Sequence, residues 1–206
     1  MKPHPATLLW KTLEDLVEDR NLGKDPHALE INVRNYYTPA LLIDFFSGNE
    51  IGEQYKGGKY IGITENKEFA KGLKKRYHSN GLKNFKFLLI DPKKIDKKLK
   101  DEFDVIFTRN PLIETKYLKD PIRDWKTIME KTNNVLKYEG LFIATNPTGE
   151  GHEIFKGIVE DQFFLKIERD IKNEHVDETM YVKGTYNGKE IKTVEDQYVL
   201  LARKIA

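Results

Sequence analysis

The sequence contains no cysteine, and this absence excludes several kinds of chemistry at once. Without cysteine there is no disulfide, no thiolate ligand for zinc and no cysteine nucleophile. Long apolar runs are also absent, and the N-terminal residues lack the hydrophobic region of a secretory signal, so we predict neither a membrane span nor export. We therefore expect a cytoplasmic protein.

Some residue types are rare: tryptophan occurs twice, methionine three times, and glutamine is scarce, whereas 33% of the residues are charged. Abundant Lys and Glu without Cys is the composition typical of hyperthermophile proteins. The net charge is only +2. Lysine is nevertheless concentrated at 71–76 and 93–100, which indicates either solvated helix faces or surfaces that contact phosphate groups.

Apolar segments alternate with amphipathic ones along the chain. The predicted strands, which are apolar and bounded by turn residues, are 40–43, 60–63, 85–90, 103–107, 141–145, 163–171 and 197–202. The predicted helices, with apolar residues at helical spacing, are 5–20, 68–77, 122–136 and 152–160. Residues 179–194 alternate around Asn187-Gly188 and predict a hairpin. This order predicts an α/β fold, with a doubly wound, mostly parallel sheet of seven strands capped at one edge by a C-terminal antiparallel strand.

Polar residues follow the first four predicted strands at the points where each strand ends. They are Asp44 with Ser47, Gly48 and Asn49, then Thr64 and Glu65, then Asp91-Pro92, and finally Asn110-Pro111. Ligands of open α/β sheets bind beyond the carboxyl ends of the strands. A glycine lets the backbone approach a ligand, and carboxylates accept hydrogen bonds from ribose hydroxyls or an adenine amine. Together these residues predict a pocket for a nucleoside.

In this order the chain resembles the class I methyltransferases that use S-adenosyl-L-methionine (SAM), and within them the nucleic-acid amino-methyltransferases of the N6-adenine and N4-cytosine type. That group carries Asp-Pro-Phe-x-Gly-x-Gly after its first strand. Residues 44–50 read Asp-Phe-Phe-Ser-Gly-Asn-Glu, with Phe45 in place of the proline and Glu50 in place of the second glycine. After its fourth strand the group carries Asp/Asn/Ser-Pro-Pro-aromatic, and residues 110–113 read Asn-Pro-Leu-Ile. The helix that begins at His4-Pro5 is also similar to the group's helix before strand one, and the resemblance covers residues 4–147.

The resemblance implies a Rossmann-like class I methyltransferase fold in a single domain over residues 1–206. Its parts would be an N-terminal helical cap (1–39), a cofactor-binding core (40–147) and C-terminal strands with a hairpin (148–206). It implies SAM as the cofactor, bound by Asp44, Phe46, Ser47, Gly48, Asn49, Thr64, Glu65, Asp91 and Pro92. The family's ribose-binding acid falls at Thr64, but Glu65 is favoured for that role because a carboxylate accepts from both ribose hydroxyls.

The same resemblance implies that Asn110 and Pro111 are catalytic. The side-chain oxygen of Asn110 and the carbonyl of Pro111 would accept hydrogen bonds from a target amine and orient its lone pair at the methyl carbon. A ring that stacks on a flipped base would come from Tyr36, Tyr37 or Tyr117.

A structural explanation stands beside each of these roles. Asp44 could cap a helix, while Asp91 and Asn110 could end strands in turns. The adjacent tyrosines Tyr36 and Tyr37 could serve only in packing. The five histidines are scattered, so we predict no metal site.

Three hypotheses of function remain open at this point. The first is a SAM-dependent enzyme that methylates an exocyclic amine of a base in DNA or RNA, as a homodimer or as a subunit of a larger complex. The second keeps the enzyme but changes the substrate to a small molecule or a protein. The third is a non-catalytic, methyltransferase-like binding protein, to which the departures at Glu50 and Leu112-Ile113 point.

Overall fold

The computed structural model describes residues 5–17, 22–47, 58–79, 81–100, 102–176, 181–186 and 188–206. The strands are β1 (His27–Ile31), β2 (Lys59–Ile63), β3 (Phe85–Leu88), β4 (Phe103–Arg109), β5 (Leu136–Asn146), β6 (Leu165–Lys172), β7 (Tyr181–Tyr186), β8 (Lys189–Val194) and β9 (Tyr198–Lys204). The helices are α1 (Pro5–Val17), α2 (Thr38–Ser47), α3 (Lys67–Ser79), the 3-10 helix η1 (Pro92–Lys94), α4 (Ile95–Lys98), α5 (Pro121–Thr132) and α6 (Gly149–Glu160). In the part of the chain so described, no helix combines the length and the apolar character that a membrane crossing requires.

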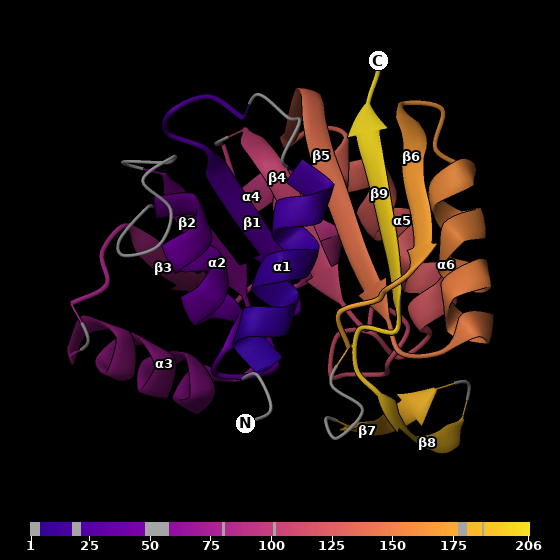
Figure 1. Ribbon diagram of the computed structural model, residues 1–206, viewed down its shortest axis with the longest axis horizontal. Helices are drawn as coiled ribbons and strands as arrows, with labels where there is room; N and C mark the ends of the chain where they lie inside the picture. Colours follow the sequence, from indigo (N-terminus) through magenta and orange to yellow (C-terminus); the bar gives the residue numbers. More distant parts are fainter. Residues whose placement is uncertain are drawn as a thin grey trace.

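Seven strands form one sheet in the order β3-β2-β1-β4-β5-β9-β6, and β7 pairs with β8 as a separate hairpin (Figure 1). The pairs from β3 to β5 are parallel, whereas β9 is antiparallel to both β5 and β6. The predicted mostly parallel seven-stranded sheet, with its C-terminal antiparallel strand and extra hairpin, is therefore confirmed.

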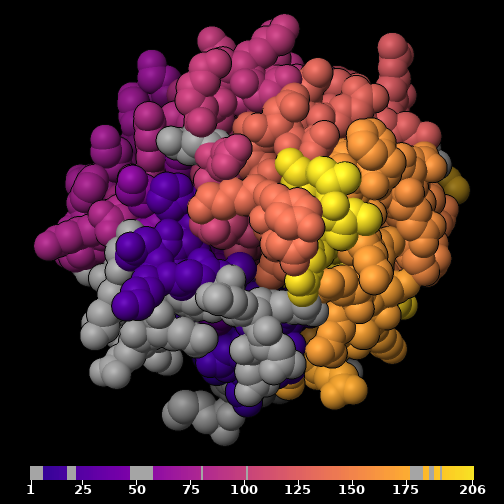
Figure 2. All heavy atoms as spheres, turned by 90° about the horizontal axis from the view of Figure 1, so that it is seen from above, coloured from indigo at the N-terminus to yellow at the C-terminus, as the bar shows by residue number. Residues whose placement is uncertain are grey.

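The position of the antiparallel strand differs from the prediction, because β9 lies inside the sheet and β6 forms the edge. Residues Val199 to Ala202 are all buried, so this strand needs cover on both faces and a neighbour on each side. The edge strand β6, by contrast, has exposed residues along most of its length. Seen from the amino-terminal edge of the parallel strands, the yellow C-terminal residues emerge between segments coloured salmon and orange (Figure 2).

The first strand of the sheet is not the segment that the sequence indicated. Residues 40–43 lie in α2, and β1 lies at His27–Ile31, within the segment expected to be a helical cap. The side-chain oxygen of Asn35 accepts hydrogen bonds from the backbone N–H groups of Tyr37 and Thr38, which satisfies donors at the start of α2. A short apolar run has the same composition in a buried strand and in a buried helix, so periodicity alone could not decide.

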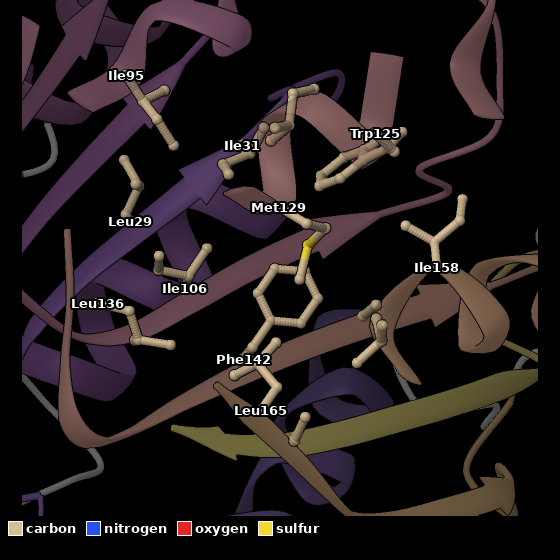
Figure 3. Close-up of a cluster of buried hydrophobic side chains, with 14 of the residues drawn as sticks. Leu29, Ile31, Ile95, Ile106, Trp125, Met129, Leu136, Phe142, Ile158 and Leu165 are labelled. Atoms are coloured by element: carbon tan, nitrogen blue, oxygen red, sulfur yellow. The ribbon is translucent and has the colours of Figure 1, made fainter. Parts of the chain in front are cut away.

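Helices pack on both faces of the sheet, each through its own layer of hydrophobic side chains. The helices α1, α2 and α3 cover one face, where Leu42 packs in the same cluster as Phe107 of β4. The helices α4, α5 and α6 cover the other face, where Trp125 lies edge-on to Phe142 with ring centroids 6.5 Å apart (Figure 3). Because successive residues of a strand point to opposite faces, Ile106 belongs to this second layer and its neighbour Phe107 to the first.

Candidate active site

The loops that follow the parallel strands meet at one edge of the sheet, toward which β5 and β6 point in Figure 1. Backbone hydrogen bonds join these strand ends in sequence: Val33 N–H donates to Ile63 O at 2.8 Å, and Thr64 N–H donates to Leu88 O at 3.1 Å. On the other side, Asn110 N–H donates to Thr145 O at 2.8 Å. Because β1 also pairs with β4, where Ile31 lies opposite Thr108, the carboxyl ends of five strands form one continuous rim. Ligand sites in open α/β sheets lie at such a rim.

Two asparagines turn the chain sharply where strands reach this rim. Asn32 follows β1 with φ = 70°, and Asn110 follows β4 with φ = 51°. Side chains other than glycine rarely adopt this left-handed region, and asparagine tolerates it better than most. Sparsely populated backbone conformations are enriched at functional sites, so both loops are candidates for such a site.

Arg34, from the loop after β1, extends to the loop after β4. Its Nη2 donates to the main-chain oxygen of Ile113 at 2.6 Å. The side-chain oxygen of Asn32, with its amide oriented toward the guanidinium, accepts from Nη2 and Nε at 3.0 Å each. Burial lowers the pKa of Arg34 to about 10, and the charge of Glu65 opposes this shift. A cation therefore lies between the two loops at neutral pH.

The predicted acids after β2 and β3 both reach the rim. The Glu65 carboxylate accepts a hydrogen bond from Tyr117 N–H at 3.1 Å, so it already anchors the segment after the β4 loop. The Asp91 carboxylate accepts from Lys93 N–H at 3.0 Å and caps η1, in which Pro92 is the first residue. Thr64, which precedes Glu65 in the sequence, is buried. Each of the two carboxylates has a second oxygen that does not take part in the bond named here.

Asn110 and Pro111 differ from each other in how their acceptor atoms are used. The side-chain oxygen of Asn110 is buried and has no hydrogen-bond partner among the residues that the structure describes. The Pro111 carbonyl is turned toward α5, where it accepts from the indole N–H of Trp125 at 2.6 Å. Among the described residues of the rim, Asn110 therefore has a buried acceptor without a partner.

Residues 40–198 match the family model described as a methyltransferase domain. The chain belongs to this methyltransferase family. No curated protein matches its sequence.

Several solved structures share the fold of this methyltransferase-family chain at low sequence identity. An rRNA methylase from Streptococcus thermophilus is 11% identical with a TM-score of 0.61, and the match covers 100% of this chain and 99% of that one. NSun6 from Pyrococcus horikoshii, crystallised with SFG, is 14% identical with a TM-score of 0.63 over 100% and 53% of the two chains. A SAM-dependent O-methyltransferase from Thermotoga maritima is 16% identical with a TM-score of 0.59 over 100% and 66%. This chain thus spans about half of the second structure and just under two thirds of the third.

The residues expected to form the first cofactor loop lie elsewhere in this methyltransferase domain. Asp44, Phe46 and Ser47 are in α2. That helix begins at the rim and ends near the opposite edge of the sheet. There Gly58, the residue before β2, packs so closely on the end of the helix that a Cβ on it would lie 1.9 Å from Phe46 O and 2.7 Å from Pro26 O. The prediction that these residues follow the first strand is wrong, and the segment that does so is 32–37. Gly48, Asn49 and Glu50 lie outside the described residues.

The three candidate stacking tyrosines have different surroundings. Tyr36 is 48% exposed at the rim, edge-on to Phe69 with ring centroids 4.7 Å apart. Arg76 of α3 lies 5.9 Å from the centroid of the same ring. Tyr37 is half-buried, and its hydroxyl donates to Glu195 at 2.5 Å. Tyr117 is half-buried in the segment held by Glu65. Tyr36 is therefore the one of the three with an exposed ring.

A buried ionic network was not predicted from the sequence. Arg109, the last residue of β4, donates through Nε to Asp196 at 2.8 Å and through Nη2 to Glu195 at 2.9 Å. Its Nη1 also donates to the hydroxyls of Tyr37 and Thr38. The network fixes the end of β4 against the start of α2 and the segment before β9. A charged residue that ends an apolar strand signals a buried partner, but the partner is 87 positions away in sequence.

The hairpin covers the loop that carries Asn110. Glu114 N–H donates to Thr185 O at 2.9 Å, and a Cβ on Gly184 would lie 2.6 Å from Ile113 Cγ2. Beside this contact is a cavity of about 340 Å³ between Leu112, the start of α5 and the turn at Gly188. Sites for small ligands have volumes of this order.

His152, Glu153 and Asp170 place ligand atoms within 4.8 Å of one another, which raises the question of a metal. Both ring nitrogens of His152 have neighbours, Asn146 at 3.4 Å and Asp170 at 2.6 Å. Asp170 also pairs with Lys156 at 2.5 Å. A lysine ammonium already neutralises this carboxylate, so the cluster is explained as an ion-pair network between α6 and β6.

Proposed function

We propose that this chain binds SAM at the rim and transfers its methyl group to an exocyclic amine of a base in DNA or RNA. The observation that carries the proposal is the buried, unpaired side-chain oxygen of Asn110. Leaving such an acceptor unsatisfied costs about 1–3 kcal/mol, which a donor from a bound ligand would recover. An amine N–H is a donor of this kind, and Asn110 follows β4 at the position where the resembling group holds its target.

The residues at the rim fit a nucleoside cofactor in their chemistry. Glu65 offers a carboxylate oxygen for ribose hydroxyls, and Asp91 offers one for an adenine amine. The left-handed backbone at Asn32 follows β1, in the loop where the resembling group has glycines. When bound, SAM supplies an electrophilic methyl group. The chain itself has to bind the two reactants and position them in line.

The target amine would be held by Asn110 alone. The Pro111 carbonyl already accepts from Trp125, so its role is to fix the loop rather than to contact the substrate. By accepting a hydrogen bond from the amine, the Asn110 oxygen would orient the nitrogen lone pair and stabilise the positive charge that develops there. The cavity that Leu112 lines lies farther along the same loop, two residues after Asn110.

A nucleic-acid substrate is supported by the surface beside the rim. α3 carries Lys67, Lys71, Lys74, Lys75 and Arg76 against a single acid, Glu68. All five basic side chains are exposed, and the exposed ring of Tyr36 lies next to Arg76. Cationic side chains beside an exposed aromatic ring are the combination that binds single-stranded nucleic acid.

A second function is favoured by Arg34. Its guanidinium joins the loops after β1 and β4, in the space that a cofactor would share with them. This arrangement supports a methyltransferase-fold protein that binds a ligand or a partner without transferring a methyl group.

One experiment separates the two functions. The heat released on addition of SAM measures cofactor binding, and transfer of radiolabelled methyl groups to total RNA and total DNA measures the reaction. The proposed enzyme binds SAM and labels one of the two polymers. Binding without transfer to either polymer would favour the binding protein, provided that a known methyltransferase labels the same RNA and DNA.

A further inference from the structure

We infer that Arg34 is a binding subsite for the carboxylate at the amino-acid end of the cofactor, an inference that rests on the proposed binding of SAM. Under this assignment the guanidinium exchanges its neutral partners, Ile113 O and the Asn32 side chain, for the ligand carboxylate. The motif of the resembling group after the first strand specifies glycines and no arginine. The resemblance therefore assigns no role to Arg34.

None of the hydrogen-bond partners of Arg34 in the described part of the chain carries a negative charge. Its described hydrogen bonds go to a main-chain carbonyl and to an amide oxygen, both neutral. In the described part of the chain no carboxylate lies within ion-pair distance, and Glu65 acts on it only through its charge. A guanidinium binds a carboxylate in a bidentate manner and more strongly than it binds neutral acceptors. A half-buried cation whose hydrogen-bond partners are neutral can therefore accept an anionic ligand.

The position of Arg34 selects a carboxylate that belongs to a nucleoside. It shares the rim with Glu65 and Asp91, which would hold the ribose and the base of the same ligand. A ligand bound by these acids carries its amino-acid end toward the remaining loops, and the loop after β1 is one of them. The carboxylates of the site repel a phosphate more strongly than they repel a group of single charge.

The same side chain links cofactor binding to the loop that would hold the substrate. Ile113 O accepts from Arg34, and Ile113 N–H donates to Asn110 O at 3.2 Å. When Arg34 turns to a carboxylate, the loop from Asn110 to Ile113 loses its tie to the loop after β1. Cofactor binding would thereby loosen the loop at Ile113, while Pro111 stays attached to Trp125.

The test compares three ligands that differ only at the amino-acid end, by calorimetry without any methyl transfer. They are S-adenosylhomocysteine, its decarboxylated form S-adenosyl-3-thiopropylamine, and 5′-methylthioadenosine. The wild-type protein should bind the first about tenfold or more tightly than the second. Arg34→Met should bring the two affinities together by weakening only the first, and Arg34→Lys should restore part of the difference. Arg169→Met, an exposed arginine on β6, is the matched control and should change nothing.

The outcomes distinguish this inference from the proposed function. Equal affinity of the wild-type protein for the first two ligands overturns the carboxylate subsite, while binding of methylthioadenosine still upholds the cofactor site. Tighter binding of all three ligands by Arg34→Met also overturns it, because Arg34 then blocks the site. If no ligand binds to any variant, the proposed function fails together with the inference. Circular dichroism melts of each variant establish that the protein measured is folded.

Discussion

The indole N–H of Trp125 donates to the main-chain oxygen of Pro111 at 2.6 Å, and this bond attaches α5 to the loop after β4. Trp125 is fully buried, and its ring also packs edge-on against Phe155 with centroids 5.1 Å apart. The loop that carries Asn110 is therefore attached to the core at Pro111.

Replacing Trp125 by phenylalanine should destabilise the protein by about 1–3 kcal/mol, because the Pro111 carbonyl would lose its donor in a buried position. Urea denaturation measures this change in the free energy of unfolding. Trp10→Phe is the matched control, since the indole of Trp10 donates to Glu14 at an exposed site. Equal costs for the two variants would show that the bond to Pro111 contributes nothing.

Asn110→Gly should leave the protein folded and SAM affinity within about twofold, but lower methyl transfer by about a hundredfold or more. Glycine accepts the left-handed backbone at φ = 51° without strain, so loss of the side chain is separated from a backbone effect. Single-turnover transfer and calorimetry provide the two measurements. Asn84→Gly, an exposed residue before β3 with the same backbone requirement at φ = 58°, controls for the change to glycine. Full methylation by Asn110→Gly would refute the assigned role.

Arg109→Met should cost about 3–5 kcal/mol of stability, because it leaves the buried Asp196 and Glu195 carboxylates without their cation. Arg203→Met removes an arginine whose partners Glu139 and Glu168 are more exposed, and it should cost less than about 1 kcal/mol. Thermal melts of the two variants against the wild type give the comparison. The prediction fails if Arg109→Met melts within the range of Arg203→Met.

Glu30 should make stability fall as the pH rises. It is buried and accepts from the Tyr60 hydroxyl at 2.5 Å, and burial raises its pKa from 4.5 to about 7 despite that bond and the charge of Arg109. Between these values the folded protein holds a proton that the unfolded chain has released. The stabilisation is thus complete below pH 4.5 and lost as the pH passes 7.

Glu30→Gln should remove this part of the pH dependence, which amounts to a slope of at most about 1.4 kcal/mol per pH unit. Urea denaturation of both proteins across the interval from pH 4.5 to 7 measures it. The exposed Glu130→Gln variant should keep the wild-type slope. Parallel curves for the wild type and Glu30→Gln would contradict the raised pKa.

Tyr36→Ala should weaken binding of single-stranded RNA about tenfold, because stacking on one aromatic ring contributes about 1–3 kcal/mol per base. Fluorescence anisotropy with a labelled oligonucleotide measures the affinity. Tyr138 is 68% exposed near the other edge of the sheet, so Tyr138→Ala is the matched control and should leave the affinity unchanged. Identical losses in both variants would remove α3 and Tyr36 as the binding surface.

Local pattern determined most of the architecture. The strands at 60–63, 103–107 and 141–145 could be predicted because each is an apolar run bounded by turn residues, and the turn at Gly188 because an Asn-Gly pair suits a hairpin. The Asn-Pro at 110–111 was correctly placed at the end of a strand for the same reason. These features depend on neighbours within a few residues, which the sequence displays directly.

Tertiary structure decided the first strand and the chemistry of the rim. Leu41-Leu42-Ile43 is apolar in either conformation, and only packing of α2 against the sheet selected the helix. Arg34 meets Ile113 across 79 positions, and Arg109 meets Asp196 across 87. Such partners are chosen by burial, since a charge withdrawn from water has to find acceptors wherever the fold brings them. No local pattern in the sequence records that choice.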